Sequence, residues 1–287
     1  MHIVSAVVVL YNPNLLELEN NLNTLLNQVD YLVLIDNSDN SNLNYLKINL
    51  PSFQKNIQYI FNNSNIGIAS AQNIGIHLSN NLKTDFILLM DQDSCPRNAM
   101  VSTLLSDFHK LKDNNINIAA IGPVPINSEN NLPYTPRIRK LIPFHFDNKL
   151  YNANDLISSG MLIDATTLDK IGLFDEKLFI DGVDHEWCWR AKLNNFYICQ
   201  TKNTEILHSL GEGDKSILGL RIAISSPFRI YYQYRNYIYL LKKKHVPVYW
   251  KLNNLIKYTI KYFYYPIFVS YKYFTRINKG LFDGFKL

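Results

Sequence analysis

The residues best suited to chemistry are two aspartates, Asp91 and Asp93, which follow the uninterrupted apolar run Phe86 to Met90. Such a run predicts a buried strand, and carboxylates at positions i and i+2 after its end can share a hard cation. Mg²⁺ and Mn²⁺ take oxygen ligands and complete their shell with phosphate and water. The pattern therefore favours a metal-held diphosphate. The alternative is an exposed acidic turn in which Asp93 caps the next helix.

A second acidic group, Asp181, Asp184 and Glu186, lies at the start of a predicted helix. Negative charge at a helix N-terminus is stabilised by the helix dipole, so simple capping is one interpretation. The other is general-base catalysis, in which a carboxylate takes the proton of an attacking hydroxyl. Asp184 is the first candidate for this base and Asp181 the second, and we expect Glu186 to orient its neighbours. Trp187 and Trp189 are expected to pack or to stack on a sugar ring.

Polar residues follow the other predicted strands as well. Tyr11-Asn12-Pro13, Asp36-Asn37-Ser38 and Asn65-Ile66-Gly67 each stand where an apolar run stops. Open α/β sheets bind ligands at the carboxyl ends of their strands, so the set predicts a nucleotide pocket, although an ordinary turn explains each segment alone. His208 ends a later predicted strand. It is either an ordinary polar residue or a further ligand beside Asp93.

These residues are positioned by short apolar runs that alternate with amphipathic segments, the pattern of a parallel sheet with crossover helices. Strands are predicted over residues 3–10, 31–35, 57–61, 86–90, 118–124, 156–163, 197–198 and 205–208, and helices over 15–26, 66–78, 100–111 and 184–193. Residues 127–150 are predicted to form a mobile loop and 209–226 a second loop. The division is an α/β domain over 1–225 and a helical segment over 226–287.

The bulk composition excludes several classes of protein. Of the 287 residues, 47% are hydrophobic and 18% charged, which predicts a folded chain. The net charge of +5 is mild and the first half has no basic face, so nucleic acid is not an expected partner. The cysteines Cys95, Cys188 and Cys199 form no CxxC pair, which fits a reducing compartment. The pattern predicts neither a signal peptide nor a spanning helix.

The segment after residue 226 combines aromatic and basic side chains, for example Tyr231-Tyr232, Lys242-Lys243-Lys244 and Tyr262-Phe263-Tyr264-Tyr265. Aromatic rings and lysines together suit the interface of an anionic bilayer. The alternative is a helical hairpin that packs on the catalytic domain and uses its lysines for solubility. The clustering of both features favours peripheral membrane contact.

Taken in order, the motifs resemble those of glycosyltransferase family 2, inverting enzymes with the GT-A fold, and especially bacterial rhamnosyltransferases of polysaccharide and O-antigen assembly. The resemblance covers roughly residues 3–240. It rests on Val8–Pro13, Ile35–Ser38, Asn65–Ala69, Ala71–Gly75, Asp91–Asp93, Ser159–Gly160, Phe174–Glu176, Asp184–Arg190, His208–Gly211 and Tyr231–Asn236. It implies a Rossmann-like, mostly parallel central sheet flanked by helices, with a C-terminal helical extension.

The resemblance also implies which residues bind the nucleotide. Tyr11 and Asp36 lie where the family holds the base and the ribose. Asn65, Gly67 and Asn73 lie in the segment that faces the nucleotide.

For the metal and the base, the resemblance matches Asp91 and Asp93 to the family's DxD motif, with Asp93 the more direct ligand and Asp91 near the nucleotide as well. His208 matches a histidine that often joins the metal site, and Asp184 matches the general base. Many relatives carry a glutamate directly before that aspartate, where this chain has a valine. The base therefore rests on Asp184, and Asp181 stays open.

The implied reaction is a single in-line displacement that inverts the anomeric carbon, with Mg²⁺ or Mn²⁺ and a nucleotide-sugar donor, dTDP-β-L-rhamnose being favoured. The implied acceptor is a saccharide or a lipid-linked saccharide of cell-surface polysaccharide, met in the cytoplasm at the inner face of the membrane. The alternatives are a UDP-hexose donor in the same family, or a nucleotidyltransferase. The last would need a glycine-rich, basic phosphate loop after the first strand, and Tyr11–Asn14 is not one.

Overall fold

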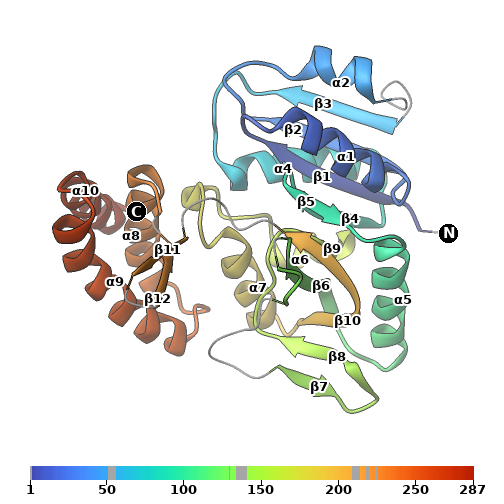
Figure 1. Cartoon of the computed structure of the whole chain (residues 1–287). Helices are drawn as coiled ribbons and strands as arrows, with labels where there is room; N and C mark the ends of the chain where they lie inside the picture. The colour runs from blue at the N-terminus through green and yellow to red at the C-terminus, as the bar shows by residue number, and fades with distance from the viewer. Residues whose placement is uncertain are drawn as a thin grey trace.

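The computed structural model describes residues 2–50, 56–128, 130–133, 141–208, 214–217, 220–223 and 225–287. The predicted α/β fold is confirmed (Figure 1). The strands are β1 Val4–Leu10, β2 Tyr31–Asp36, β3 Ile57–Phe61, β4 Phe86–Asp91, β5 Ser94–Pro96, β6 Ile118–Asn127, β7 Ile142–Phe144, β8 Asp147–Ala153, β9 Met161–Asp164, β10 Tyr197–His208, β11 Asp214–Ile217 and β12 Leu220–Ala223.

The helices alternate with these strands in the first half and follow one another at the end of the chain. They are α1 Leu15–Leu26, α2 Leu43–Asn49, α4 Ile68–Asn81, α5 Met100–Asp113, α6 Leu168–Ile171, α7 Val183–Leu193, α8 Pro227–Leu241, α9 Val248–Phe268 and α10 Lys272–Lys286, with short 3₁₀ turns η1 Ala165–Thr167 and η2 Glu176–Leu178.

The central sheet has the strand order β3-β2-β1-β4-β9-β6-β10-β8-β7, and β5 pairs with β10. Strands β1 to β4 pair in parallel, and the parallel pair β6/β10 joins them through the antiparallel strand β9. Consequently β1, β2, β3, β4, β6 and β10 all run in one direction. Their carboxyl ends meet at one edge of the sheet, the edge at which ligands of such sheets bind.

Two hydrophobic cores cover the two faces of the sheet, and β1 shows why. Its residues alternate between the faces, as the two-residue period of a strand requires: Val7 and Val9 pack with α4 and α7, whereas Val8 and Leu10 pack with α1 and α5. All seven residues of β1 are buried, so the strand reads as a continuous apolar run. The helix predicted over 15–26 has the observed bounds of α1.

Several predicted elements differ from the structure. The predicted strands over 197–198 and 205–208 are one strand, β10, with a register shift between Gln200 and Glu205. The predicted strand over 156–163 begins only at Met161, after Gly160 with its φ of +83°. The predicted loops over 127–150 and 209–226 contain the hairpins β7–β8 and β11–β12. Residues 129, 134–140, 209–213, 218–219 and 224 lie outside the described part of the chain.

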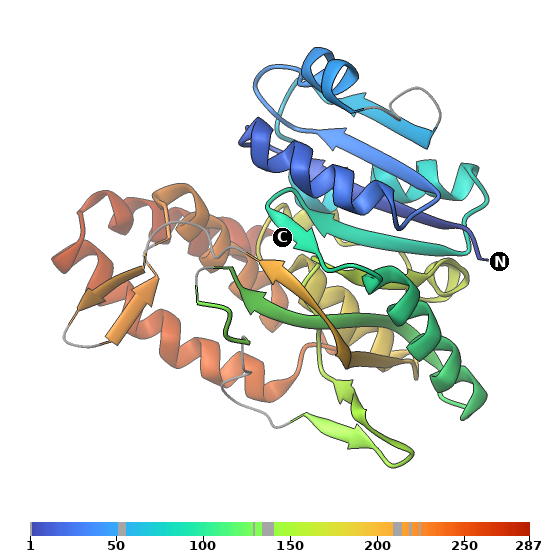
Figure 2. The same cartoon turned by 45° about the vertical axis from the view of Figure 1, so that its right-hand side comes forward.

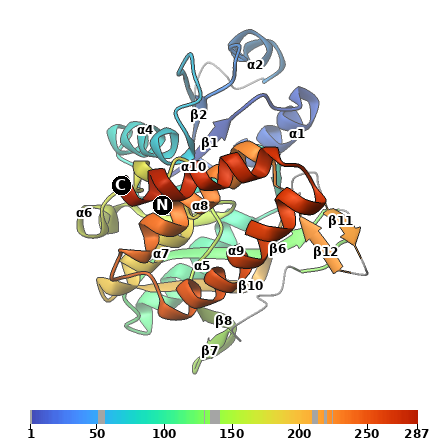
Figure 3. The same cartoon turned by 90° about the vertical axis from the view of Figure 1, so that its left-hand side faces the viewer.

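The last three helices pack on one another and on the α/β unit (Figure 3). Ile230, Tyr234, Tyr265, Tyr273 and Ile277 form their own buried core. Helix α8 contacts the α/β unit, where the Asn236 amide donates to the carbonyls of Leu178, Ile180 and Asp181 at 2.7–3.0 Å. No helix in the described part of the chain is long and apolar enough to cross a membrane. A domain boundary at residue 225 stays a prediction.

Helices α8 and α10 approach each other closely because α10 carries glycines at the contact. A Cβ at Gly280 would lie 2.5 Å from the Tyr231 carbonyl oxygen, and one at Gly284 would lie 2.6 Å from that of Arg235. These atoms belong to the α8 backbone, which cannot move aside as a side chain can. The two glycines, one helical turn apart, therefore fix the distance between α8 and α10.

We expect Gly280→Leu to lower the free energy of unfolding by about 3 kcal/mol, because the new side chain must push α10 away from α8. Chemical denaturation measures the change. Arg276→Ala alters an exposed residue of the same helix and should change the stability by less than about 0.5 kcal/mol. Equal stability of the two variants would contradict the close contact.

Candidate active site

The strand-end segments meet at the carboxyl edge of the sheet, and Gln92 ties two of them together. Its side-chain oxygen accepts the Tyr11 backbone N–H at 2.7 Å, and its amide donates to the Tyr11 carbonyl at 3.2 Å. The loop after β1 is thereby held against Asp91 and Asp93 on either side of Gln92. Tyr11 itself is 48% exposed at this edge, a position open to a ligand. No pattern in the sequence indicated this role of Gln92.

Three predicted site carboxylates lie near enough to act on one another. Burial and the charges of Asp93 and Asp184 raise the pKa of Asp91 to about 7, and the guanidinium of Arg229 opposes this shift. The fold thus brings together residues that are more than ninety positions apart in the chain. Accumulated negative charge of this kind is what a cation neutralises.

Asp184 lies in the first turn of α7, as expected for the candidate base. Its carboxylate accepts the backbone N–H of Ser158 at 3.2 Å and that of His185 at 2.9 Å. These two bonds fix its orientation and leave further lone pairs on its oxygens for a hydroxyl. Burial opposes a charge on His185, but the carboxylates of Asp184 and Asp155 outweigh it and raise the pKa of His185 to about 10. A positive charge therefore stands beside the acidic group.

Asp181, the second candidate for the base, is bound to an arginine. Arg229 donates to the two Asp181 oxygens at 2.7–3.1 Å in a forked pair. Asp181 has a left-handed backbone with a φ of +66°, and its neighbour Phe179 has a φ of +62°. The charge of Arg229 also acts on Asp184 and Asp91. Arg229 is a site residue that no sequence motif indicated, because its position depends on how α8 packs.

Asp36 ends β2 and is fully buried. Its carboxylate accepts the Tyr59 hydroxyl at 2.5 Å, the Asn42 backbone and amide N–H at 3.0 and 2.9 Å, and the Ser38 backbone N–H at 2.9 Å. In the structure Asp36 therefore organises the loop after β2. The prediction that it contacts the base or ribose stays a prediction.

Asn65 and Gly67 shape the turn before α4. The Asn65 side chain accepts the Gly67 N–H at 3.0 Å. Gly67 has a φ of +88°, and a Cβ on it would lie 2.6 Å from the Phe179 ring and 2.8 Å from the Phe179 carbonyl oxygen. The Ile68 N–H donates to that carbonyl at 2.7 Å. Gly67 is thus required for close approach to the segment that carries Asp181, whether or not it also faces a nucleotide.

Asn73 is 3% exposed and forms a clamp within the fold. Its amide donates to the Phe174 carbonyl at 3.0 Å and to Glu176 at 2.9 Å, and its side-chain oxygen accepts the Phe174 N–H at 3.0 Å. Both polar atoms of Asn73 are therefore engaged with segment 174–176. The structure gives Asn73 this anchoring role, and its place in the segment that faces the nucleotide stays a prediction.

His208 ends β10, where its backbone pairs with Ser94, the residue after Asp93. The side chain of His208 and the residues 209–213 that follow lie outside what the structure describes. The backbone pairing nevertheless brings the two predicted metal-site segments side by side. Ligation by His208 stays a prediction.

The residues present fit a hard divalent cation. Asp91 and Asp93 offer carboxylate oxygens, and a cation beside them would stabilise the ionised form of Asp91, whose pKa is raised by burial and by the charges of Asp93 and Asp184. Within the described residues, no three acidic, histidine or cysteine side chains converge as a complete metal site. A cation held by this pair would need oxygens from the diphosphate and water, as Mg²⁺ commonly does.

The remaining α7 residues anchor the helix. Trp187 and Trp189 are buried to 0% and 2% exposure, so they pack in the core and do not stack on a sugar. Glu186 pairs with Arg190 at 2.9 Å and with His245 at 2.8 Å. These partners lower the pKa of Glu186 against the effect of its burial. Glu186 therefore orients its neighbours, as predicted.

We expect Gln92→Ala to raise the Michaelis constant for the donor about tenfold with little loss of stability, because the loop carrying Tyr11 loses two hydrogen bonds. Steady-state kinetics over a range of donor concentrations measures this effect. Gln58→Ala, on the exposed side of β3, is the matched control. An unchanged Michaelis constant for the donor in Gln92→Ala would show that the hydrogen bonds between Gln92 and Tyr11 do not contribute to donor binding.

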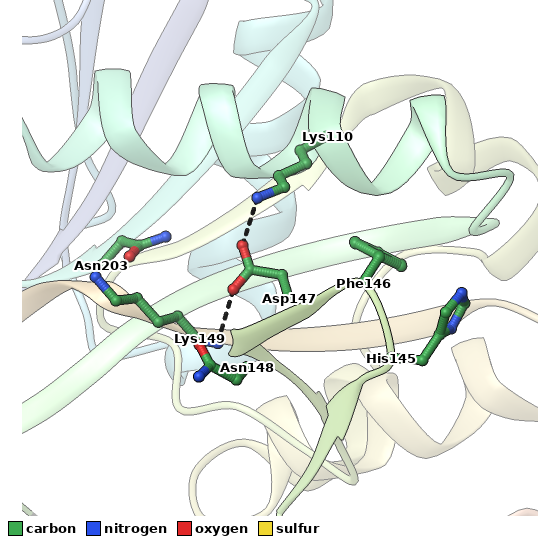
Figure 4. A pocket seen from close by; sticks show the side chains of 7 residues that line it. All are labelled: Lys110, His145, Phe146, Asp147, Asn148, Lys149 and Asn203. Atoms are coloured by element: carbon green, nitrogen blue, oxygen red, sulfur yellow. Dashed lines mark hydrogen bonds and ion pairs between the residues drawn. The ribbon is translucent and has the colours of Figure 1, made fainter.

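A separate hollow of about 540 Å³ lies beside β8 and the end of α5 (Figure 4). Lys110 and Asp147 form an ion pair of 2.6 Å there, and the Lys149 N–H donates to Asp147 at 2.8 Å. None of the predicted site residues lines this hollow. It is therefore distinct from the strand-end site.

Comparison with known proteins identifies the family of the chain. The model of glycosyl transferase family 2 matches residues 5–172. The dTDP-rhamnosyl transferase RfbF of Shigella flexneri is 34% identical over 251 residues, covering 85% of this chain and 82% of RfbF. The galactofuranosyltransferase GlfT1 of Mycolicibacterium smegmatis is 27% identical over 262 residues, covering 84% and 83%.

Among solved structures, S. aureus TarS 1-349 in complex with UDP-GlcNAc superposes with a TM-score of 0.61 at 15% identity, over 99% of this chain and 81% of that one. This likeness shows the GT-A fold. The family match runs from the first strand past Asp91 and Asp93 to residue 172, more than half of the chain, and the relative of 34% identity covers 85% of it. The chain therefore belongs to glycosyltransferase family 2.

Proposed function

We propose that this chain transfers L-rhamnose from dTDP-β-L-rhamnose to a saccharide or lipid-linked saccharide acceptor of cell-surface polysaccharide, with inversion at the anomeric carbon. The observation that carries the proposal is the acidic site at the carboxyl edge, Asp91 and Asp93 with Asp184 close by. The choice of donor is supported by the 34% identity to a dTDP-rhamnosyl transferase.

In this proposal, different residues act on the acceptor side and on the leaving-group side of the anomeric carbon. Asp184, oriented by the N–H groups of Ser158 and His185, takes the proton of the acceptor hydroxyl as that oxygen attacks. Asp91 and Asp93 would hold Mg²⁺ or Mn²⁺, with His208 as the third candidate ligand. When bound, the cation would offset the charge that grows on the departing diphosphate. Arg229, held by Asp181, adds fixed positive charge to the same region.

A donor screen tests the proposal. The purified chain is incubated with Mg²⁺ or Mn²⁺ and with dTDP-β-L-rhamnose or a panel of UDP-hexoses, and the release of nucleoside diphosphate is measured. We expect release from dTDP-rhamnose to exceed that from each UDP-hexose at least tenfold in kcat/KM. Turnover of a UDP-hexose alone would refute the rhamnose assignment and leave the family intact.

A UDP-hexose donor is the second candidate. Two observations favour it: a galactofuranosyltransferase of 27% identity spans most of the chain, and the fold is shared with a UDP-GlcNAc complex. The nucleotidyltransferase alternative has no such support, because the chain belongs to a family of glycosyltransferases. The donor screen separates the two sugar donors directly.

The proposed acceptor also sets the proposed location, the cytoplasmic side of the cell membrane. A lipid-linked saccharide stays in the bilayer, so the enzyme must work at its surface. The aromatic and basic C-terminal helices are the part of the chain suited to that contact.

A further inference from the structure

Helix α9 leaves a continuous apolar stripe uncovered. Its members recur every three or four residues, which places them on one side of the helix. The stripe consists of Val248, Leu252, Leu255, Ile256, Ile260, Phe263 and Ile267, each 50–70% exposed. Beyond the helix the stripe continues into Tyr271, also 70% exposed. Isolated exposed apolar residues are normal on a protein surface, but a row of this length marks a contact surface.

The chain segment that carries the stripe bears charge of one sign. Residues 242–282 contain lysines and an arginine but no aspartate or glutamate. Exposed lysines stand before the helix and after it, at Lys244 and Lys272. Together with the stripe they form an amphipathic surface with a basic margin. This composition is typical of helices that lie in the interface of an anionic bilayer.

The same charges disfavour a second copy of this chain as the occupant. Two copies meeting through the stripe would bring their basic margins together without any carboxylate between them. Such like-charge contact opposes association, whereas anionic lipid headgroups complement the margin. The charge pattern therefore favours a lipid surface over a dimer.

The opposite side of α9 faces the catalytic unit. Trp250, Asn254, Lys257 and Tyr258 line a pocket of about 210 Å³ between α7, α8 and α9. Asp181, Gly182 and His185, which flank Asp184 in the chain, line the same pocket. Aromatic rings among amide and charged side chains suit a sugar ring, which has both apolar and hydroxyl-bearing faces. Figure 2 shows α9, drawn in orange, along the lower edge of the C-terminal helices, and Figure 3 shows it facing the viewer below α8.

We propose that the α9 stripe binds an anionic bilayer. This contact positions the pocket between α7, α8 and α9 at the membrane surface, so that the sugar of a membrane-borne acceptor can enter the pocket. The membrane contact stands on the exposed stripe and its basic margin. The acceptor part rests on the proposed sugar transfer. Helix α9 thus contacts lipid with one side and lines the saccharide pocket with the other.

Vesicle flotation tests the contact. The stripe variant combines Leu252→Ser, Ile256→Ser, Ile260→Ser and Phe263→Ser. A matched control combines Leu16→Ser, Ile48→Ser, Ile142→Ser and Leu193→Ser, which are 63–81% exposed elsewhere. The probes are vesicles of phosphatidylcholine with and without phosphatidylglycerol. We expect wild type and control to bind the anionic vesicles, more weakly at high salt, and the stripe variant to bind at least about tenfold less tightly.

Transfer to two matched acceptors tests the orientation. An octadecyl glycoside resides in the vesicles, and the methyl glycoside of the same sugar stays in water. The stripe variant should lose transfer to the octadecyl glycoside at least about tenfold and keep transfer to the methyl glycoside. Equal loss on both acceptors would refute the orientation. If no donor is turned over, the proposed function fails while vesicle binding still reports on the stripe.

Two results would overturn the contact itself. The first is equal vesicle binding by wild type and stripe variant. The second is that the wild type is a dimer in lipid-free buffer, that the stripe variant is a monomer there, and that neither protein binds vesicles. That outcome would assign the stripe to a second copy of the chain.

Discussion

Asp184→Asn is expected to reduce the rate constant for sugar transfer by about 100- to 10,000-fold, the range contributed by a general base. Asparagine keeps the shape of the side chain, and its single oxygen can still accept one of the two N–H bonds that Ser158 and His185 donate to the two Asp184 oxygens. It cannot take a proton from the acceptor hydroxyl. The fold and the donor site should remain intact, so the loss should appear in kcat and leave the donor dissociation constant within about twofold.

Nucleoside-diphosphate release in the presence of acceptor measures the rate, and calorimetry measures donor binding. Asp181→Asn is the matched variant, because it makes the same chemical change three residues away. It breaks the forked pair with Arg229 and should act mainly through that arginine, with about a tenfold loss. If Asp181→Asn abolishes transfer while Asp184→Asn is active, the base is Asp181 and our assignment is wrong.

Asp93→Asn is expected to cost about 100-fold in kcat/KM and to raise the Mg²⁺ or Mn²⁺ concentration for half-maximal activity at least tenfold. One carboxylate of the metal-binding pair is lost, and Asp91 alone is a weaker anchor for a divalent cation. Chelation of the metal from the wild-type enzyme should abolish transfer, and added Mn²⁺ should restore it.

The control is Asp113→Asn, an exposed carboxylate at the end of α5. It changes the net charge of the chain by the same amount and should leave both the rate and the metal dependence unaltered. Full activity after chelation, or an unshifted metal titration in Asp93→Asn, would show that this chain transfers sugar without a metal at Asp93.

Local sequence was sufficient to locate a strand or helix wherever its buried residues follow the period of that element. The strands β1 and β4 are buried along their length, and α1 has leucines in a single stripe, so composition alone located them. The polar residues that end β1, β2 and β4 were then located as well, because the ends of parallel strands share one edge. Asp91, Asp93 and Asp184 lie near enough for their charges to interact, and their roles as metal ligands and general base stay predictions.

Where a residue's partner lies far along the chain, the sequence predicts the structure incompletely. The middle of β10 is polar, so its sequence pattern predicts two short strands in place of one. Asp107 of α5 holds that middle by accepting the Thr201 hydroxyl at 2.6 Å and the Asn203 amide at 3.0 Å. These hydrogen bonds satisfy buried polar groups that would otherwise interrupt the strand.

At the site and in the C-terminal helices, the dependence on distant partners likewise divides what the sequence determined from what the tertiary structure decided. The sequence by itself determined the acidic pair, the candidate base and the aromatic, basic character of the last helices, since these are properties of residue types and spacing. Only the tertiary structure decided that Asn73 clamps segment 174–176, that Arg229 binds Asp181, and that one side of α9 stays uncovered. Each of these depends on contacts between segments that meet only after the chain has folded.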